Sequence, residues 1–477
     1  MRLLATLVCS FALCGCATPA AVKPAAFAHH AAAIDWAKAG DEAVAVLSGY
    51  LQVDTQNPPG NEARAARHLA ALLEKEGLVA QLHEFGPGRA NLVARLKAEG
   101  APAQKPLCLL SHTDVVPADP GEWPKETGPL SGAVRDGFVW GRGALDMKGM
   151  GALELLTFIW LHRQKVPLKR DVLLLAVGDE EVNNLGMSQV VDSLWSQLDC
   201  GAVLNEGGIG MKALFFEGQT VFPITVAEKG TLWLKLVARG EPGHGSTPVP
   251  GRAPARLLEA VNALATLQPE VRIHPSLYEL LRQVGMHQQG LTGFVLQHPP
   301  LVRAFVTRRL LANPATRAAV TDTCQVTGYG GAGTSPNVIP SQVEAVLDCR
   351  VLPGTTPAAL KARLERALRG IEGVFLQVIQ ERAATASDWD DPLYEALVNE
   401  LRRGRPDVVA GPALSPGFTD SILARPKGAK AYGLVPFELE LEDLKSYHGV
   451  NERVSVANVR RGLEVLFRAV VEASAAR

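Results

Sequence analysis

The sequence predicts an α/β protein in which helices flank a mainly parallel sheet and an α+β domain is inserted into the larger one. Three observations support this prediction. Uninterrupted apolar runs such as "PLCLL" and "DVLLLAV" are typical of strands that are buried on both faces of a parallel sheet. Segments with helical periodicity alternate with these runs. From about Phe222 apolar and polar residues alternate instead, which favours half-exposed antiparallel strands.

The amino terminus is expected to hold a targeting segment and a tether. Residues 1–16, "MRLLATLVCSFALCGC", combine one basic residue, an apolar core and small residues up to Cys16, as in a bacterial lipoprotein-type signal peptide. An ordinary signal peptide or a buried apolar start is the alternative. Residues 17–34 are rich in Ala and Pro and are expected to be a disordered tether. We therefore expect an exported protein, periplasmic or at the cell surface, anchored by lipid on Cys16.

Residues 35–221 and 384–477 are expected to form the larger, α/β domain. "NLVARL", "PLCLLSHTD", "DVLLLAVGDEE" and "GAVLNEGG" are predicted strands. The turn-forming residues of "NPPGNE" precede a predicted helix that runs to about Leu78. Further helices are predicted over 36–51 and 148–164.

Residues 222–383 are expected to form the inserted domain. "FPITVAEKGTLWLKLVARG" and "NVIPSQVEAVLDCRVLPG" alternate as antiparallel strands do, and "VFLQVIQERA" adds another. Between them lie predicted helices, "GRAPARLLEAVNALATL" and "TPAALKARLERALRG", the second with Thr356 as its N-cap. Helix-like segments also fill 268–321.

Charge and cysteine content exclude several classes of protein. The 477 residues hold 48 Lys and Arg against 49 Asp and Glu, a balance that argues against a nucleic-acid or membrane-surface partner. Four cysteines lie beyond the signal region, scattered and without a C-x-x-C pair, so buried thiols are expected rather than a disulfide framework. They are Cys108, Cys200, Cys324 and Cys349.

Histidine and acidic residues stand where the apolar runs end. His112 and Asp114, two apart, can lie side by side at the end of one strand, although a loop pair is the alternative. Asp146 precedes a predicted helix and would serve equally well as its N-cap. The three acids at 179–181 repel one another unless cations or solvent compensate. Glu206 and His448 complete the set.

This set of residues favours a catalytic metal site. Open α/β sheets bind ligands at the carboxyl ends of their strands. Imidazole and carboxylate ligands without thiolates suit a catalytic zinc site better than a structural one. A carboxylate can bridge two metal ions in a hydrolytic centre, and a further carboxylate can act as the general base.

The motifs together resemble the co-catalytic zinc metallopeptidase family of aminoacylase, glutamate carboxypeptidase and succinyl-diaminopimelate desuccinylase. "SHTDVVPA", "GRGALDMKG", "GDEE", "NEGG", "GHGSTP" and "YHGVNERVS" match that family in order, over about residues 35–467. The similarity is greatest to the Gly-Xaa carboxypeptidase and N-acyl-amino-acid hydrolase branch. It implies a zinc-peptidase catalytic domain with an inserted lid or dimerisation domain.

The resemblance also implies a ligand set for two divalent metal ions, taken to be zinc. His112 and Glu206 would bind one ion, Glu181 and His448 the other, and Asp146 would bridge both.

The resemblance assigns further roles near the metal ions. Asp114 would orient His112, and Glu180 would be the general base that takes a proton from the attacking water. A cis peptide bond would follow Asp146. His244 would stabilise the oxyanion, often from a neighbouring subunit, although taken alone it is a loop histidine.

Substrate contacts are implied at Asn337, Arg350 and Thr419. Asn337 and Arg350 would hold polar groups and the free carboxylate of the substrate, and a guanidinium suits that carboxylate, although a lone Arg at a strand end is usually solvated. Phe418 and Ile422 depart from the residues common in the family, which puts the substrate preference in doubt.

The resulting prediction is zinc-dependent hydrolysis of an amide bond adjacent to a free carboxylate, in a dipeptide or an N-acyl amino acid. A zinc aminopeptidase is one alternative, and it would need an acidic pocket for the substrate amine. A non-catalytic, peptide-binding lipoprotein is the other, and it would lack a ligand or the base. A homodimer through the inserted domain is also expected.

Overall fold

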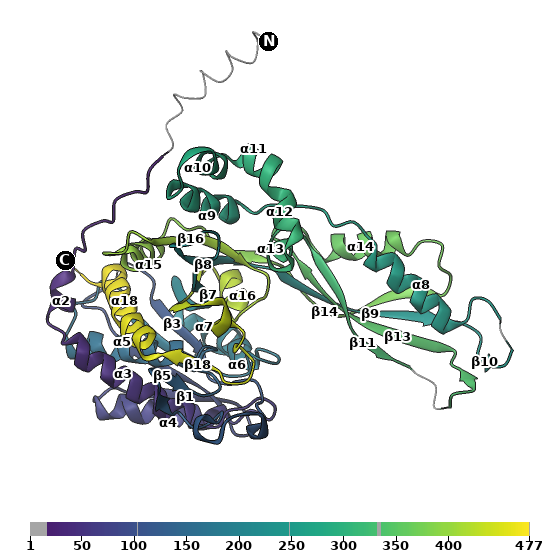
Figure 1. Ribbon diagram of the computed structural model, residues 1–477. Coiled ribbons are helices and arrows are strands. Elements are labelled where there is room, and N and C mark those ends of the chain that lie inside the picture. Colours follow the sequence, from purple (N-terminus) through teal and green to yellow (C-terminus); the bar gives the residue numbers. More distant parts are fainter. Residues whose placement is uncertain (1–16, 103, 248, 332–334, 477) are drawn as a thin grey trace, which may run out of the picture.

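Figure 1 shows the computed structural model, which describes residues 17–476 apart from residues 103, 248 and 332–334. The signal peptide expected over residues 1–16, with Cys16, lies outside the described residues.

The larger domain is built on a nine-stranded mixed sheet. The order is β1-β2-β6-β3-β7-β17-β8-β15, with β16 beside β8. The pairs β6–β3, β3–β7, β7–β17 and β8–β16 are parallel, so the predicted mainly parallel sheet is confirmed. The strands are β1 (Ala80–Gly86), β2 (Arg89–Leu96), β3 (Leu107–His112), β6 (Val172–Val177), β7 (Ala202–Lys212), β8 (Thr220–Glu228), β15 (Thr385–Ala386), β16 (Val408–Ser415) and β17 (Lys430–Leu439).

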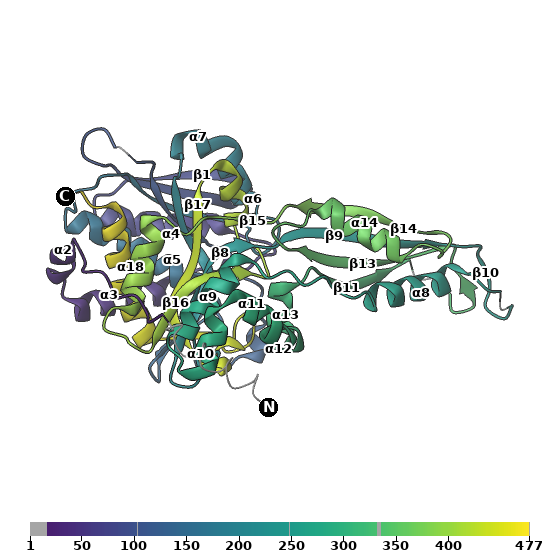
Figure 2. The same cartoon turned by 90° about the horizontal axis from the view of Figure 1, so that it is seen from above.

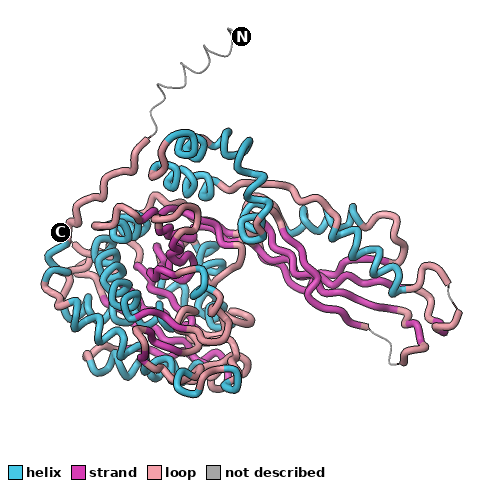
Figure 3. The backbone as a smooth tube through the Cα atoms, viewed as in Figure 1, coloured by secondary structure: helices cyan, strands magenta, loops and turns pink. Residues whose placement is uncertain are grey.

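Helices cover both faces of this sheet (Figure 3). One core contains side chains from α3 (Trp36–Leu51), α4 (Glu62–Lys75), α5 (Lys148–Arg163), α15 (Pro392–Arg402) and α18 (Val456–Ser474). The opposite core contains side chains from α6 (Leu185–Gln189), η4 (Val190–Leu194), α7 (Trp195–Leu198) and α16 (Ser421–Ala424). Every residue of β3 and β6 is buried, as expected for continuous apolar strands that pack on both faces.

Short elements complete this domain. A three-stranded sheet pairs β18 (Arg453–Ser455) with β5 (Phe138–Trp140) and β4 (Val134–Arg135). The remaining short elements are single helical turns: η2 (Pro120–Glu122), η3 (Lys125–Thr127), η6 (Arg425–Lys427) and α17 (Leu441–Leu444).

The lid domain is a four-stranded antiparallel sheet that projects from the larger domain (Figure 2). Its order is β11 (Thr323–Gly330), β13 (Gln342–Val351), β9 (Gly230–Arg239) and β14 (Val374–Arg382). The helices α8 (Ala253–Ala265) and α14 (Pro357–Ala367) pack on the buried face, toward which alternate residues of β13 point. Thr356 is the N-cap of α14, as predicted, because its side chain accepts a hydrogen bond from the Ala359 N–H. Both views place the two-residue strand β10 (Gly243–His244), paired with β12 (Val338–Ile339), at the end remote from the large sheet.

The two sheets join at Lys229. β8 belongs to the large sheet, so the expected boundary at 222 falls inside a strand, and the lid begins only at β9. The buried Lys229 side chain donates from Nζ to the carbonyl oxygens of Ala318 and Thr321 (3.1 and 2.9 Å) and to Thr323 Oγ1 (3.0 Å). The alternation of apolar and polar residues could not locate the boundary between β8 and β9, because it runs through both strands.

Part of the inserted segment packs on the larger domain instead of the lid sheet. Leu280, Val284 and Val302 share a core with Val221 of β8 and Val409 of β16. The helices that contribute to this core are α9 (Pro275–Met286), α10 (Gly290–Gln297) and η5 (Val302–Val306). The other helices of the segment are α11 (Pro299–Leu301), α12 (Thr307–Ala312) and α13 (Pro314–Val320).

Residues 17–34 are not a disordered tether but lie against the larger domain. The Ala17 N–H donates to Gln297 Oε1 of α10 at 2.8 Å, and the Phe27 N–H donates to Glu472 Oε1 at 2.8 Å. Lys23 pairs with Glu395 at 2.8 Å, and α2 (Ala28–Ala32) follows. The composition predicts disorder because Ala and Pro side chains bury little apolar surface. Instead, backbone N–H groups and the Lys23 ammonium group form hydrogen bonds and an ion pair with side chains of α10, α15 and α18.

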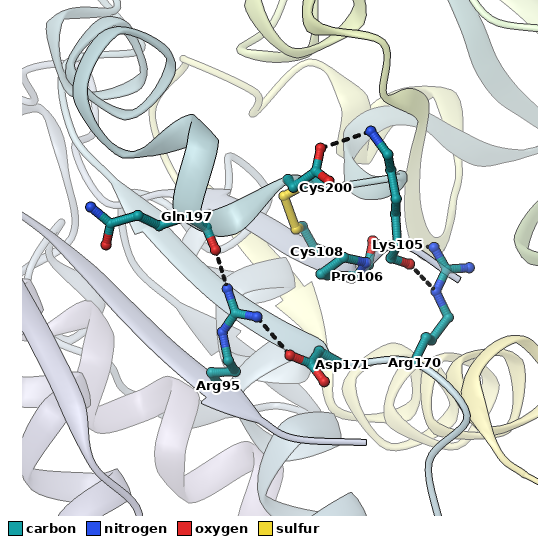
Figure 4. The surroundings of a disulfide bond; sticks show 9 residues. Arg95, Lys105, Pro106, Cys108, Arg170, Asp171, Gln197 and Cys200 are labelled. Carbon is teal, nitrogen blue, oxygen red and sulfur yellow. Dashed lines mark hydrogen bonds and ion pairs between the residues drawn. A yellow bond between two sulfur atoms is a disulfide. The ribbon is translucent and has the colours of Figure 1, made fainter. Parts of the chain in front are cut away.

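The four cysteines form two disulfides, so the expectation of buried thiols is wrong. Cys108 of β3 is bonded to Cys200, which precedes β7, with their Cα atoms 5.9 Å apart (Figure 4). Cys324 and Cys349 are bonded across facing positions of β11 and β13. Both pairings arise from strand neighbours, which scattered cysteine spacing does not reveal.

Candidate metal centre

The sheet topology brings the predicted ligands together at one edge. The strands β6, β3 and β7 are parallel neighbours, so their carboxyl ends meet there. His112 is the last residue of β3, Glu180 and Glu181 follow β6, and Glu206 lies in β7.

Asp146 lies between two imidazoles. Its Oδ1 is 2.9 Å from His112 Nε2, and its Oδ2 is 2.6 Å from His448 Nε2. His448 arrives from the loop between α17 and β18, more than 300 residues later in the chain. The Asp146–Met147 peptide bond is cis, as the resemblance implied. Each oxygen of one carboxylate thus faces a different imidazole, which is the arrangement that a bridging ligand requires.

Glutamates flank each imidazole. Glu206 Oε1 is 3.8 Å from His112 Nε2, and Glu181 Oε1 is 3.4 Å from His448 Nε2. Glu181 Oε1 is buried and makes no hydrogen bond among the described residues. Among the described residues, three groups have candidate ligand atoms within 4.8 Å of one another. Two of them contain His112, one with Glu180 and Glu206 and the other with Asp146 and Glu181, and the third is Glu62, Asp114 and Asp179. An orphaned carboxylate oxygen amid imidazole nitrogens fits bound divalent cations.

The charges of the site favour cations at both imidazoles. Burial lowers the pKa of His112, but the hydrogen bond with Asp146 and the charge of Glu206 outweigh it and raise the pKa well above its usual value. The hydrogen bond with Asp146, followed by attraction to the charge of Glu181, raises the pKa of His448 to about 10. Burial raises the pKa values of Glu180 and Glu206 well above normal, and repulsion adds to it, from Glu206 on Glu180 and from Asp146 on Glu206. A positive charge among these groups would relieve that repulsion.

Asp114 contacts His112 differently from what the resemblance implied. His112 Nδ1 lies 2.9 Å from the backbone oxygen of Asp114, whereas the nearest carboxylate oxygen is 3.7 Å away. The carboxylate instead accepts hydrogen bonds from the N–H groups of Glu180 (3.1 Å) and Glu181 (3.2 Å) and from Asn57 Nδ2 (2.9 Å). Asp114 therefore orients the imidazole through its carbonyl and holds the glutamate loop through its carboxylate.

Glu452 is a supporting residue that the sequence did not single out. Its buried carboxylate accepts hydrogen bonds from the N–H groups of Gly143 (3.0 Å), Leu145 (2.7 Å) and Asp146 (3.2 Å), and from Arg142 Nη1 (2.6 Å). Arg142 also donates to the carbonyl oxygen of His448 at 3.2 Å. The pair ties the Asp146 loop to the His448 loop. Arg142 lies in "GRGALDMKG" and Glu452 in "YHGVNERVS", so the match to the family motifs could have pointed to both residues.

A second support network lies behind the glutamate loop. Arg89 donates to both Glu62 oxygens and, at 2.7 Å, to Asp179 Oδ1. Asn57 Nδ2 bridges Asp179 Oδ1 and Asp114 Oδ2, both at 2.9 Å. Glu62 and Asp179 are buried, so one guanidinium compensates two carboxylates beside Glu180.

The lid residues divide into two groups. His244 and Asn337 are exposed at the remote end of the lid, where Asn337 Nδ2 lies 3.3 Å from His244 Nε2 (Figure 2). A single chain therefore does not bring them to the metal centre. Arg350 lies at the base of the lid, paired with Asp348 at 2.7 Å and stacked 5.1 Å from the Phe418 ring centroid.

Thr419 is buried and its hydroxyl is already engaged. It donates to Glu228 Oε1 at 2.7 Å and accepts from Asn205 Nδ2 at 3.1 Å. This geometry suits a residue that fixes the loop after β16, so substrate contact by Thr419 stays a prediction.

Comparison with known proteins shows the family of this chain. Residues 108–472 match the model of peptidase family M20/M25/M40. The N-fatty-acyl-amino acid synthase/hydrolase of Bos taurus is 30% identical over 379 residues, which cover 77% of this chain and 74% of that protein. Aminoacylase-1A of Rattus norvegicus is 26% identical over 435 residues, 90% of this chain and 94% of that one.

Solved structures share the fold. An M20 family metallo-carboxypeptidase, Sso-CP2 from Sulfolobus solfataricus, has a TM-score of 0.67 at 20% identity and covers 91% of this chain and 99% of its own. Human carnosine dipeptidase 1 has a TM-score of 0.65 at 16% identity, with 94% and 99% covered. Because the family model matches residues 108–472, most of the chain, and three candidate ligands meet at the carboxyl ends of β3, β6 and β7, the chain belongs to peptidase family M20/M25/M40 and is a hydrolase.

Proposed function

We propose that this protein hydrolyses an amide bond adjacent to a free carboxylate, in an N-acyl amino acid or a dipeptide, with two zinc ions bridged by Asp146. The observation that carries the proposal is the placement of Asp146 between the Nε2 atoms of His112 and His448. The family match and the relatives, which include an N-fatty-acyl-amino acid synthase/hydrolase and an aminoacylase, support the reaction class.

The residues of the centre have distinct roles in this reaction. His112 and Glu206 would hold one ion and His448 and Glu181 the other. When bound, the ions supply polarisation of the scissile carbonyl and a lowered pKa for water. Glu180 accepts a proton from the attacking water and transfers it to the leaving nitrogen.

The proposal is tested by substituting neighbouring glutamates. Glu180→Gln should keep bound metal and lose nearly all turnover of N-acyl amino acids, because the base is lost while the ligands remain. Glu181→Gln should lose metal as well, and the exposed Glu217→Gln is the matched control. Metal analysis with single-substrate kinetics gives both readouts. Full activity of Glu180→Gln would remove Glu180 from the base role.

Arg350 favours a substrate with a free carboxylate over one with a free amine. Its guanidinium lies 5.1 Å from the centroid of the Phe418 ring at the base of the lid, and that of Arg382 lies 5.9 Å from the same ring, whereas an aminopeptidase would require an acidic pocket. Dipeptides blocked at the amino end should therefore be cleaved and dipeptides blocked at the carboxyl end should not. The reverse preference would favour the aminopeptidase. If neither kind of dipeptide were cleaved, a non-catalytic, peptide-binding lipoprotein would be favoured.

A homodimer would bring His244 of one copy to the candidate metal centre of the other, which His244 does not reach within a single chain. His244 and Asn337, at the remote end of the lid, would complete the centre of a second copy and stabilise the oxyanion there. Light scattering of the purified protein tests this assembly. A strictly monomeric enzyme with full activity would leave His244 without that role.

We further propose that the protein is exported and lipid-anchored through Cys16. Two disulfides support an oxidising compartment such as the periplasm or cell surface. Among the residues that the structure describes, no helix is both long and apolar enough to cross a bilayer. Mass spectrometry of the amino-terminal peptide from membranes would detect the acyl group.

A further inference from the structure

The start of the described chain is fixed against α10. The Ala17 N–H donates to Gln297 Oε1 at 2.8 Å, and Arg402 Nη2 donates to the carbonyl oxygen of Ala20 at 2.8 Å. Ala17 is the first residue that the structure describes, and the proposed lipid on Cys16 precedes it by one position in the sequence. The anchor would then hold the protein body against the bilayer instead of at the end of a free tether.

The segment from α9 to α13 carries more positive than negative charge. From residue 280 to residue 321 the sequence has no Asp or Glu, yet it has five arginines. Arg303, Arg308 and Arg309 are exposed, and within the described part of the chain none of them has a carboxylate partner. The near-neutral total charge, which argued against a membrane surface, therefore averages over a strongly basic local cluster.

Large apolar side chains are exposed beside this charge. Leu291, at the start of α10, is 77% exposed, and Phe305 of η5 is 67% exposed. Single exposed apolar residues are ordinary on protein surfaces. Their combination with unpaired arginines on short helices is typical of segments that lie in a membrane interface.

We propose that Leu291, Arg303, Phe305, Arg308 and Arg309 form a membrane-facing patch that rests on anionic phospholipid. This inference rests on the proposed lipid anchor at Cys16. The arginines would contact phosphate headgroups, and Leu291 and Phe305 would enter the boundary with the acyl chains. The attachment of residue 17 to α10 gives the anchored protein one defined orientation, with this patch toward the bilayer.

The test places single labels on the acylated full protein in vesicles. Because the four cysteines of the described chain are paired in disulfides, Leu291→Cys or Phe305→Cys would offer one free thiol for a fluorophore. Leu258→Cys on α8, where Leu258 is 69% exposed, is the control. In phosphatidylglycerol vesicles with brominated acyl chains, labels at 291 and 305 should be quenched and the label at 258 should not. Equal, weak quenching at all three positions would overturn the patch.

A charge variant separates the patch from the anchor. Arg303→Gln with Arg308→Gln and Arg309→Gln should abolish quenching at 291 while the acylated protein stays on the vesicles. Arg64→Gln with Arg67→Gln and Arg366→Gln, all exposed, should change nothing.

If mass spectrometry finds no acyl group, the anchor fails and the patch is tested on the unacylated protein. Each arginine near an anionic surface contributes about a factor of five, so the first triple variant should bind phosphatidylglycerol vesicles roughly 100-fold more weakly than the parent. Equal binding by parent and variant would overturn the patch independently of the anchor.

Discussion

Arg89→Gln should weaken both the fold and the catalytic step, because Arg89 compensates two buried carboxylates behind the metal centre. Its side chain is 16% exposed, whereas those of Glu62 and Asp179 are 0% and 1% exposed. Removing one partner of a buried ion pair typically costs 3–5 kcal/mol. Gln retains one hydrogen bond and Arg89 has some solvent contact, so we expect a loss of about 3 kcal/mol in the free energy of unfolding.

The catalytic effect follows from the contacts of Asp179. Asp179 precedes Glu180 and shares Asn57 with Asp114, which holds the Glu180 N–H. A displacement near 1 Å at the base can cost about 100-fold, so kcat should fall by about 10- to 100-fold while metal content is retained.

Urea unfolding, metal analysis and steady-state kinetics check the Arg89 prediction, with the exposed Arg64→Gln on α4 as control. If Arg89→Gln lost stability but kept the parent kcat, the network would not position Glu180. If it unfolded like the parent, the charge-compensation reasoning would be wrong.

Further predictions concern the oxyanion, the metal and the disulfide. His244→Ala should lower kcat by about 10²–10³ with metal content unchanged, and a loss of metal would instead make it a ligand. Chelation should lower the melting temperature, because bound cations at 100 times their Kd contribute about 2.7 kcal/mol; an unchanged temperature in fully demetallated protein would contradict the assigned ligands. Replacing Cys108 and Cys200 by Ala should cost about 4–5 kcal/mol in chemical denaturation, from the 92-residue separation that the disulfide closes. A loss under about 1 kcal/mol would rule out that bond as a structural crosslink.

The sequence predicted the elements that depend on local pattern. The apolar runs of β3 and β6 specify buried strands, and parallel strands must end at one edge, so the meeting of His112 with the glutamate loop followed from the fold class. The position of His448 came only from the resemblance, since it lies in a loop without periodic pattern.

Long-range partners could not be predicted in this way. The contacts of Arg89 and Glu452 join loops that are far apart in sequence, and a single charged residue does not reveal its partner. The disulfides depend on which strands become neighbours. The packing of residues 17–34 depends on acceptors on three helices that composition does not describe.

The junction at Lys229 has a mechanical consequence. A single residue, Lys229, separates β8 from β9. Its buried ammonium group donates hydrogen bonds to the end of α13 and the start of β11. The strands beyond this point form one stiff arm with β10 at its tip. A few degrees of torsion at the root would therefore move the tip through a wide arc. In the proposed homodimer, the fit between the two copies would be set at this junction, far from the tip.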